Sequence, residues 1–206
     1  MELSRRGCVL MLIDMQRAFC SPDGSMAAQG RDIGTMRAAM LAGSRLAAAA
    51  RAAGVPVLWT RMQFAPDYSD GGLLVHELRP NLKAIGALRR GTPDVDIAPE
   101  AGWREGDAVL DKARYSAFVG TKLDAWLREH AIERALVGGV STSMCVDSTV
   151  RGLSQRDTAT FAVREACGDF DAARHEAALS AMAFGFARVI GMDDALAALA
   201  GPGREF

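Results

Sequence analysis

The chain has 206 residues, half of them apolar, so it is long enough to bury a substantial core as one domain. Its 24 basic and 25 acidic residues give a net charge of −1, and no dense basic run favours nucleic acid as a partner. No apolar stretch reaches the roughly 18 residues that suggest a membrane span. We therefore expect a single domain over residues 1–206, with neither nucleic acid nor a membrane as partner.

Short apolar runs alternate with longer segments of helical period, as in a parallel sheet flanked by helices. The first run resembles a signal peptide, but Asp14 ends it and no small-residue cleavage site follows, so we interpret it as a buried strand. The predicted strands span residues 8–13, 55–60, 108–110, 135–140, 160–163 and 188–190. The predicted helices span residues 32–53, 122–129, 143–155, 172–184 and 193–199. The order of these elements predicts an α/β fold.

Residues 61–106 break this alternation, because they contain four prolines and show little sustained period. Segments of this length inside a compact domain are usually lids, binding loops or oligomer contacts. We therefore expect residues 61–106 to have a function.

The cysteines and histidines of this chain indicate neither a disulfide framework nor a zinc site. A chain of this size needs no disulfides, so the cysteines are expected to be free thiols in a cytoplasmic protein. The histidines lack zinc-ligand spacing, so we interpret them as surface or packing residues. The residues concerned are Cys8, Cys20, Cys145, Cys167, His76, His130 and His175.

Three polar residues stand at or just beyond the carboxyl ends of predicted strands, where open parallel sheets bind ligands. They are Asp14, Lys112 and Cys145. Each also has a plain structural interpretation: a cap or salt bridge, an exposed lysine, and a small buried hydrophobe. Cys145 lies near the start of a predicted helix, where free N–H groups and the helix dipole favour a thiolate, as a nearby lysine would. Together the three supply a base, an electrostatic partner and a nucleophile.

Three segments resemble the signature blocks of isochorismatase-like cysteine hydrolases, in matching order and with matching separations. They are residues 9–19, 111–118 and 139–149. The resemblance implies a three-layer αβα fold, with a six-stranded parallel Rossmann-like sheet and helices on both faces. It also assigns the catalytic roles: Asp14 as proton acceptor and donor, Lys112 as electrostatic partner, and Cys145 as nucleophile.

The same resemblance implies further features of the site. It predicts a cis peptide bond between Val140 and Ser141, and an oxyanion hole formed by the N–H groups of Ser141 and Cys145. Phe19 corresponds to an aromatic residue that packs on the substrate. Further candidates for substrate contact are Arg61, Gln63, Tyr68 and Tyr115, of which Arg61 is able to bind a carboxylate bidentately. An equally good interpretation of Arg61, Gln63 and Tyr68 is that they are solvated loop residues.

Two comparisons within the family narrow the expected activity. Its nicotinamidases carry an Asp-Trp-His metal run after the second strand, where this chain has Thr60 to Phe64, so no metal and no cofactor are expected. True isochorismatases lack the nucleophilic cysteine. Residues 22–27 and 112–118 look closest to the ureidoacrylate, biuret and N-carbamoylsarcosine amidohydrolases.

The sequence therefore predicts a metal-independent cysteine amidohydrolase that cleaves a C–N bond of a small amide or ureido compound through a thioester, releasing ammonia. A simple carboxamidase acting on a nicotinamide-like or maleamate-like substrate is the alternative within the family. A thiol redox or binding protein without hydrolysis is the alternative from another class. We expect a homodimer or homotetramer.

Overall fold

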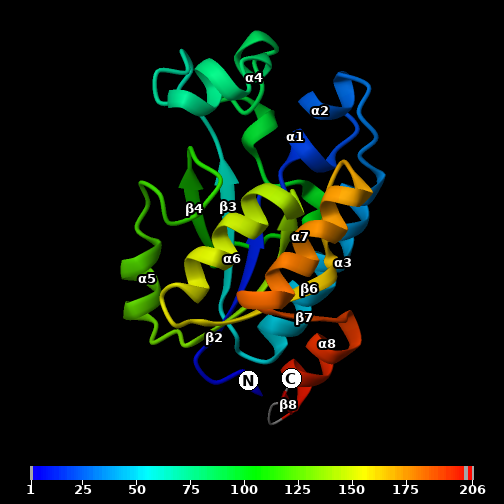
Figure 1. Ribbon diagram of the computed structural model, residues 1–206, viewed down its shortest axis with the longest axis vertical. Helices are drawn as coiled ribbons and strands as arrows, with labels where there is room; N and C mark the ends of the chain where they lie inside the picture. The colour runs from blue at the N-terminus through cyan, green and yellow to red at the C-terminus, as the bar shows by residue number, and fades with distance from the viewer. Residues whose placement is uncertain (1, 202–203, 206) are drawn as a thin grey trace.

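The computed structural model describes residues 2–201 and 204–205, which form a three-layer α/β fold around one parallel sheet (Figure 1). The sheet has six strands in the order β4-β3-β2-β5-β6-β7, and every neighbouring pair is parallel. The strands are β2 (Cys8–Ile13), β3 (Val57–Met62), β4 (Ala108–Lys112), β5 (Arg134–Val140), β6 (Ala159–Gly168) and β7 (Arg188–Ile190). The predicted fold class is confirmed.

Helices cover both faces of this sheet. One face is covered by α3 (Gly34–Ala52) and α8 (Met192–Ala200), which pack on each other. The other face is covered by α5 (Leu123–Glu129), α6 (Asp147–Ser154) and α7 (Ala172–Gly185) (Figure 1). Helix α3 ends where sequence predicted, because Gly54 adopts the left-handed φ of 72° that ends helices. Within the described residues, no helix has the length and hydropathy needed to cross a membrane.

Strand β2 lies at the centre of the sheet and all six of its residues are buried. Burial on both faces explains its unbroken apolar sequence, which is typical of a central parallel strand. Its neighbour β5 approaches it closely near Gly139, which has a φ of 148°. A side chain there would place its Cβ 2.4 Å from the Ile13 carbonyl oxygen, so only glycine allows this approach. The two strands therefore end side by side, immediately before the candidate site.

Short helices gather beyond the carboxyl ends of the strands, at the top of Figure 1. Two follow β2: α1 (Arg17–Cys20) and α2 (Ser25–Ala28). Residues 61–106 add the π-helical turn Leu74–Leu78, α4 (Asn81–Ala84) and the 3-10 turns Pro93–Val95 and Pro99–Ala101. The buried side chain of Gln16 holds residues 61–106 in place, because its Nε2 donates hydrogen bonds to the carbonyls of Met62 and Val95, each at 2.9 Å.

The structure differs from the predicted elements mainly at their ends. Strand β4 continues to Lys112 and β6 continues to Gly168, so both are longer than predicted. The predicted helix over residues 143–155 consists of the π-helical turn Thr142–Val146 followed by α6. Two further short strands, β1 (Glu2–Leu3) and β8 (Arg204–Glu205), pair antiparallel outside the main sheet.

Candidate active site

Asp14 lies directly after β2 and is fully buried. Its φ of 53° is uncommon for a residue with a side chain, and such conformations concentrate at functional sites. Thr60, in the neighbouring strand β3, donates a hydrogen bond of 2.6 Å from Oγ1 to Oδ1 of Asp14. The Asp14 carboxylate is therefore held on one side by the strand beside it.

Lys112 is the last residue of β4, on the far side of β3 from Asp14. Its Nζ lies 2.6 Å from Oδ2 of Asp14, and neither side chain is accessible to solvent. A second hydrogen bond, of 3.1 Å to the Arg114 carbonyl, helps to fix the ammonium. This is a buried, charge-assisted ion pair, which is the geometry in which removal of one partner is most costly.

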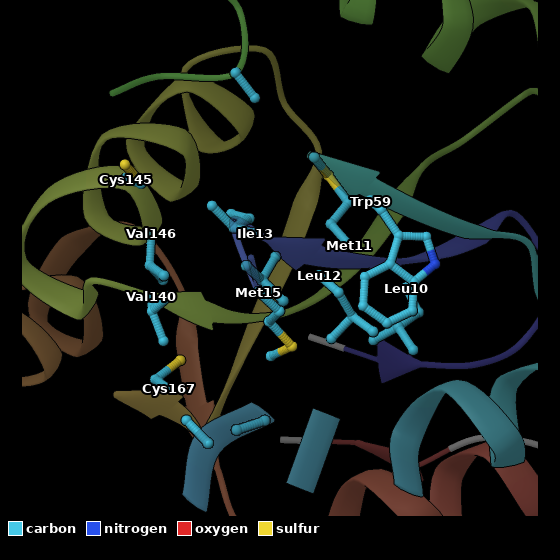
Figure 2. Packing of buried hydrophobic residues seen from close by; sticks show 14 of the residues in the cluster. Leu10, Met11, Leu12, Ile13, Met15, Trp59, Val140, Cys145, Val146 and Cys167 are labelled. Carbon is cyan, nitrogen blue, oxygen red and sulfur yellow. The ribbon is translucent and has the colours of Figure 1, made fainter. Parts of the chain in front are cut away.

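Cys145 lies on the opposite side of Asp14, in the π-helical turn that follows β5. Figure 2 shows it on this turn, with Val140 and Val146 packed in the core below it. Its thiol is buried and lies near enough to Asp14 and Lys112 for both to shift its pKa. The structure thus brings the three predicted catalytic residues together from three strand ends.

Burial raises the pKa of the Cys145 thiol. Lys112 lowers that pKa and Asp14 raises it, so the lysine does not offset the effect of burial. The lowering that was expected from a nearby lysine is present, but burial and the adjacent carboxylate outweigh it. Burial lowers the pKa of Lys112, but its interactions with Asp14 and Cys145 raise that pKa by a larger amount. The net direction is therefore upward.

The turn that carries Cys145 is fixed by two buried polar contacts. Asp169 accepts hydrogen bonds from the Ser143 amide at 2.9 Å and from its hydroxyl at 2.6 Å. Thr142 bonds through Oγ1 to Nδ1 of His175 at 2.9 Å. The peptide bond between Val140 and Ser141 is cis, the conformation that the family resemblance implies.

A small cavity of about 60 Å³ opens onto Cys145. A single water needs about 10–15 Å³ of such space, so the cavity suits a ligand of a few heavy atoms. Its wall is mostly apolar, with polar groups only at some points. The lining residues are Phe19, Met26, Arg31, Met62, Arg79, Leu82, Leu88, Tyr115, Ser141, Met144, Cys145, Asp169, Phe170 and Arg174.

The structure separates the predicted substrate contacts into two groups. Phe19 and Tyr115 line the cavity, as does Ser141. Arg61 does not, because its guanidinium bonds both carboxylate oxygens of Asp111, at 2.7 and 3.0 Å, outside the cavity. Gln63 is buried but does not line the cavity.

Tyr68, the remaining candidate, donates its hydroxyl proton to the Ala87 carbonyl at 2.7 Å and stabilises residues 61–106 instead of lining the cavity. Sequence reasoning also missed three arginines of the wall, Arg31, Arg79 and Arg174. None of the three belongs to a signature block, and no periodic pattern marks them. Among the described residues, no group of three or more metal-binding side chains is assembled.

Comparison with known proteins gives consistent relatives. The family model of the isochorismatase domain matches residues 8–194. The chain is 34% identical over 155 residues to the ureidoacrylate amidohydrolase RutB of Methylorubrum extorquens strain AM1, covering 69% of this chain and 62% of the relative. It is 33% identical over 154 residues to the protein of the same name from Klebsiella pneumoniae strain 342, covering 69% and 65%. The match thus spans less than two thirds of the length of these relatives.

A solved structure shows the same fold over nearly the whole chain. The cysteine hydrolase from Pseudomonas syringae pv. phaseolicola 1448A superimposes with a TM-score of 0.87 and 27% sequence identity, covering 96% of this chain and 94% of that one. Together with the family match, this similarity shows that the chain belongs to the isochorismatase family.

Proposed function

We propose that the protein is a metal-independent cysteine amidohydrolase that cleaves a C–N bond of a small amide or ureido compound. The observation that carries the proposal is the buried contact of 2.6 Å between Lys112 Nζ and Asp14 Oδ2, beside a buried Cys145 thiol whose pKa both residues shift. A base, a cation and a nucleophile in mutual contact at the end of a cavity are the components of covalent amide hydrolysis. The relatives named as ureidoacrylate amidohydrolases favour the ureido class.

The proposed reaction begins with proton transfer, because the thiol at rest is not ionised. Asp14 takes the Cys145 proton as the sulfur attacks the carbonyl carbon, and the lysine ammonium stabilises the charges that result. The N–H groups of Ser141 and Cys145 are the proposed donors to the oxyanion. The C–N bond then breaks, Asp14 returns the proton to the nitrogen, and ammonia leaves a thioester on Cys145.

Hydrolysis of the thioester completes the cycle. Asp14 removes a proton from a water molecule, the hydroxide attacks the thioester carbon, and the C–S bond breaks. The sulfur recovers its proton from Asp14. A ureido substrate yields a carbamate by this route, which decomposes to carbon dioxide and an amine.

The buried thiol argues against a redox or binding role. Thiol sensors depend on an accessible cysteine with a lowered pKa, so that peroxide reaches a thiolate. Cys145 is only 4% exposed and burial raises its pKa. A pure sensor also has no need of the buried Asp14 and Lys112 pair, whose assembly costs desolvation energy.

The test is an ammonia-release screen over ureido acids, biuret and simple carboxamides, with mass spectrometry of the quenched enzyme. We expect turnover of at least one compound and a covalent adduct on Cys145 that is absent in Cys145→Ala. Cys8→Ala is the matched control, because Cys8 is an equally buried thiol at the opposite end of β2 from Asp14. Hydrolysis by folded Cys145→Ala at the wild-type rate would eliminate covalent catalysis by this residue.

Activity is expected to survive prolonged treatment with EDTA. The proposed chemistry draws its positive charge from Lys112, and residues 60–64 lack the Asp-Trp-His run that the nicotinamidases of the family carry after the second strand. The measurement is turnover after dialysis against EDTA, with and without added zinc, iron or manganese. Loss on chelation and recovery with one of these ions would overturn the metal-independent assignment.

A further inference from the structure

Among the described residues, Arg79 is the arginine of the cavity wall that has neither an ion pair nor a ring contact. It follows the π-helical turn Leu74–Leu78, and its side chain is half-buried. The backbone is fixed on both sides, since the Arg79 amide donates to Leu74 at 2.8 Å and its carbonyl accepts from Leu82 at 3.0 Å. Within residues 2–201 and 204–205, the guanidinium lies in no ion pair, although it lines the cavity.

The other two arginines of the wall are already engaged and lie nearer to solvent. Arg174 is 3.6 Å from Asp169, the only carboxylate among the described residues that line the cavity, and its side chain is 52% exposed. Arg31 is exposed and stacks on Phe170, with 5.3 Å between the guanidinium carbon and the ring centroid. The wall therefore carries three positive charges and one negative charge, so the charges of Arg31 and Arg79 are not balanced, and Arg79 is the less exposed of these two.

The surroundings of Arg79 make an unbalanced charge costly. The cavity wall around it contains Leu82 and Leu88 from the same segment, and Met62 at the end of β3. Charges near apolar walls are poorly solvated, so a ligand that brings an opposite charge gains more there than it would in open water. A planar guanidinium pairs best with a carboxylate, which it binds through two parallel hydrogen bonds.

Tyr115 links Arg79 to the reacting centre. Burial raises the pKa of the Tyr115 phenol, and the charge of Arg79 lowers it. Tyr115 and Arg79 line the same small cavity as Cys145. A small substrate bound there with its carbonyl carbon at the Cys145 sulfur can therefore reach the guanidinium.

We propose that Arg79 binds a carboxylate at the far end of the substrate, so that the enzyme selects small amide or ureido acids over their neutral counterparts. This inference rests on the proposed function and adds its substrate class. Arg79 is a specificity residue in this assignment, because it contacts the end of the substrate that does not react.

The test compares each acid with a neutral partner that has the same reacting group. The probes are 3-ureidoacrylate against its methyl ester, and maleamate against maleamide, with ammonia release as the readout. Wild type is expected to prefer the acid, and Arg79→Met to lower kcat/KM for the acid about 10- to 100-fold, mainly through KM, as the loss of a charged hydrogen bond predicts. Activity on the neutral partner is expected to stay unchanged, which also shows that the variant is folded.

Two further variants separate the effect of side-chain geometry from that of net charge. Arg79→Lys retains the charge without the two-pronged geometry and is expected to recover only part of the loss. Arg104→Met removes the same charge from an exposed residue of the 61–106 segment that does not line the cavity, and is expected to leave both kcat/KM values unchanged. Equal losses on acid and neutral substrates in Arg79→Met, or no preference for acids in wild type, would overturn the assignment.

A second measurement needs no turnover and therefore separates this inference from the proposed function. Iodoacetate and iodoacetamide alkylate Cys145 by the same chemistry but differ in charge. The ratio of their rates, followed by mass spectrometry of the Cys145 peptide, is expected to fall several-fold in Arg79→Met and to stay constant in Arg104→Met. If no probe is hydrolysed, the proposed function fails, and an unchanged ratio in Arg79→Met then overturns the charge assignment as well.

Discussion

The side chain of Thr60 makes two hydrogen bonds to Asp14. The Thr60 hydroxyl donates to Oδ1 of Asp14 at 2.6 Å and accepts from the Asp14 amide at 3.2 Å. Because Lys112 holds the other carboxylate oxygen, the carboxylate is restrained at both ends. Thr60 touches no part of the cavity and is a positioning residue for the proton transfers of the proposed reaction.

Thr60→Val is expected to lower kcat about tenfold with little change in KM, because it frees one carboxylate oxygen without altering the cavity. The free energy of unfolding is expected to fall by about 1–3 kcal/mol, the cost of a buried acceptor that loses its donor. Steady-state kinetics and denaturant unfolding measure both effects. Thr60→Ser retains the hydroxyl and is expected to recover kcat, whereas a purely steric role for Thr60 would leave Ser as impaired as Val.

Asp14→Asn is expected to lower kcat by about 10²- to 10⁴-fold, although the side chains have nearly the same shape. An amide neither takes the Cys145 proton nor returns it to the leaving nitrogen. Substrate is expected still to bind, as shown by its protection of Cys145 against iodoacetamide. Asp111→Asn is the matched control, because that exposed carboxylate pairs with Arg61 away from the cavity. Near-normal turnover by Asp14→Asn would reduce Asp14 to a structural strand-end carboxylate.

The sequence predicted which residues meet at the strand ends better than which residues line the cavity, for a physical reason. Asp14, Lys112 and Cys145 stand at the ends of apolar strands, and parallel strands bring their carboxyl ends to one edge of the sheet. Arg79 lies in a segment without periodicity, so nothing in its neighbourhood predicts which way it faces. Arg61 does not line the cavity for a simple reason: it lies between Thr60 and Met62 in β3, so its side chain points to the other face.

Strand and helix centres were predictable because burial imposes a pattern on them, whereas their ends depend on tertiary contacts. Strand β6 runs on through the exposed residues Arg164 and Glu165, which no apolar pattern marks as strand. The four-residue helices α1 and α2 have no side-chain cap and were not predicted. The protonation state of Cys145 was also beyond sequence reasoning, since it depends on the depth of burial.

Buried thiols are expected to make the fold sensitive to alkali. Burial raises the pKa of Cys8 from 9.0 to about 12, against smaller lowering effects from a Leu136 backbone bond and Arg134. Because this pKa is raised in the folded state, the stabilisation that the protonated Cys8 thiol contributes is complete below pH 9. It is lost as pH rises toward 12. The slope in this window is about 1.4 kcal/mol per pH unit for one such thiol.

The measurement is the free energy of unfolding of wild type and Cys8→Ala between pH 7.5 and about 11, by denaturant titration. Because all other titrating groups are shared, the difference between the two proteins is expected to be constant up to about pH 9 and to shrink above it. A difference that stays constant throughout would show that Cys8 ionises as easily in the folded protein as in the unfolded one.

Lys112→Ala is expected to impair the enzyme in two separate ways. It leaves Asp14 buried without its cation, which is expected to cost about 3–5 kcal/mol of folding free energy. It also removes the charge that lowers the pKa of Cys145, so that this pKa rises further and the thiolate becomes rarer at any given pH. Each unit of increase slows thiolate alkylation about tenfold at neutral pH.

The rate of Cys145 alkylation by iodoacetamide between about pH 6.5 and 9.5 separates these effects. In wild type the logarithm of the rate is expected to rise by one per pH unit without a plateau, because the thiol pKa lies above this range. The Lys112→Ala line is expected to run parallel and lower, at a temperature where circular dichroism shows the variant folded. Lys83→Ala, which removes an exposed lysine, controls for net charge. If the two lines coincide, Lys112 exerts no electrostatic effect on the thiol, and any loss of activity in its variant reflects the fold alone.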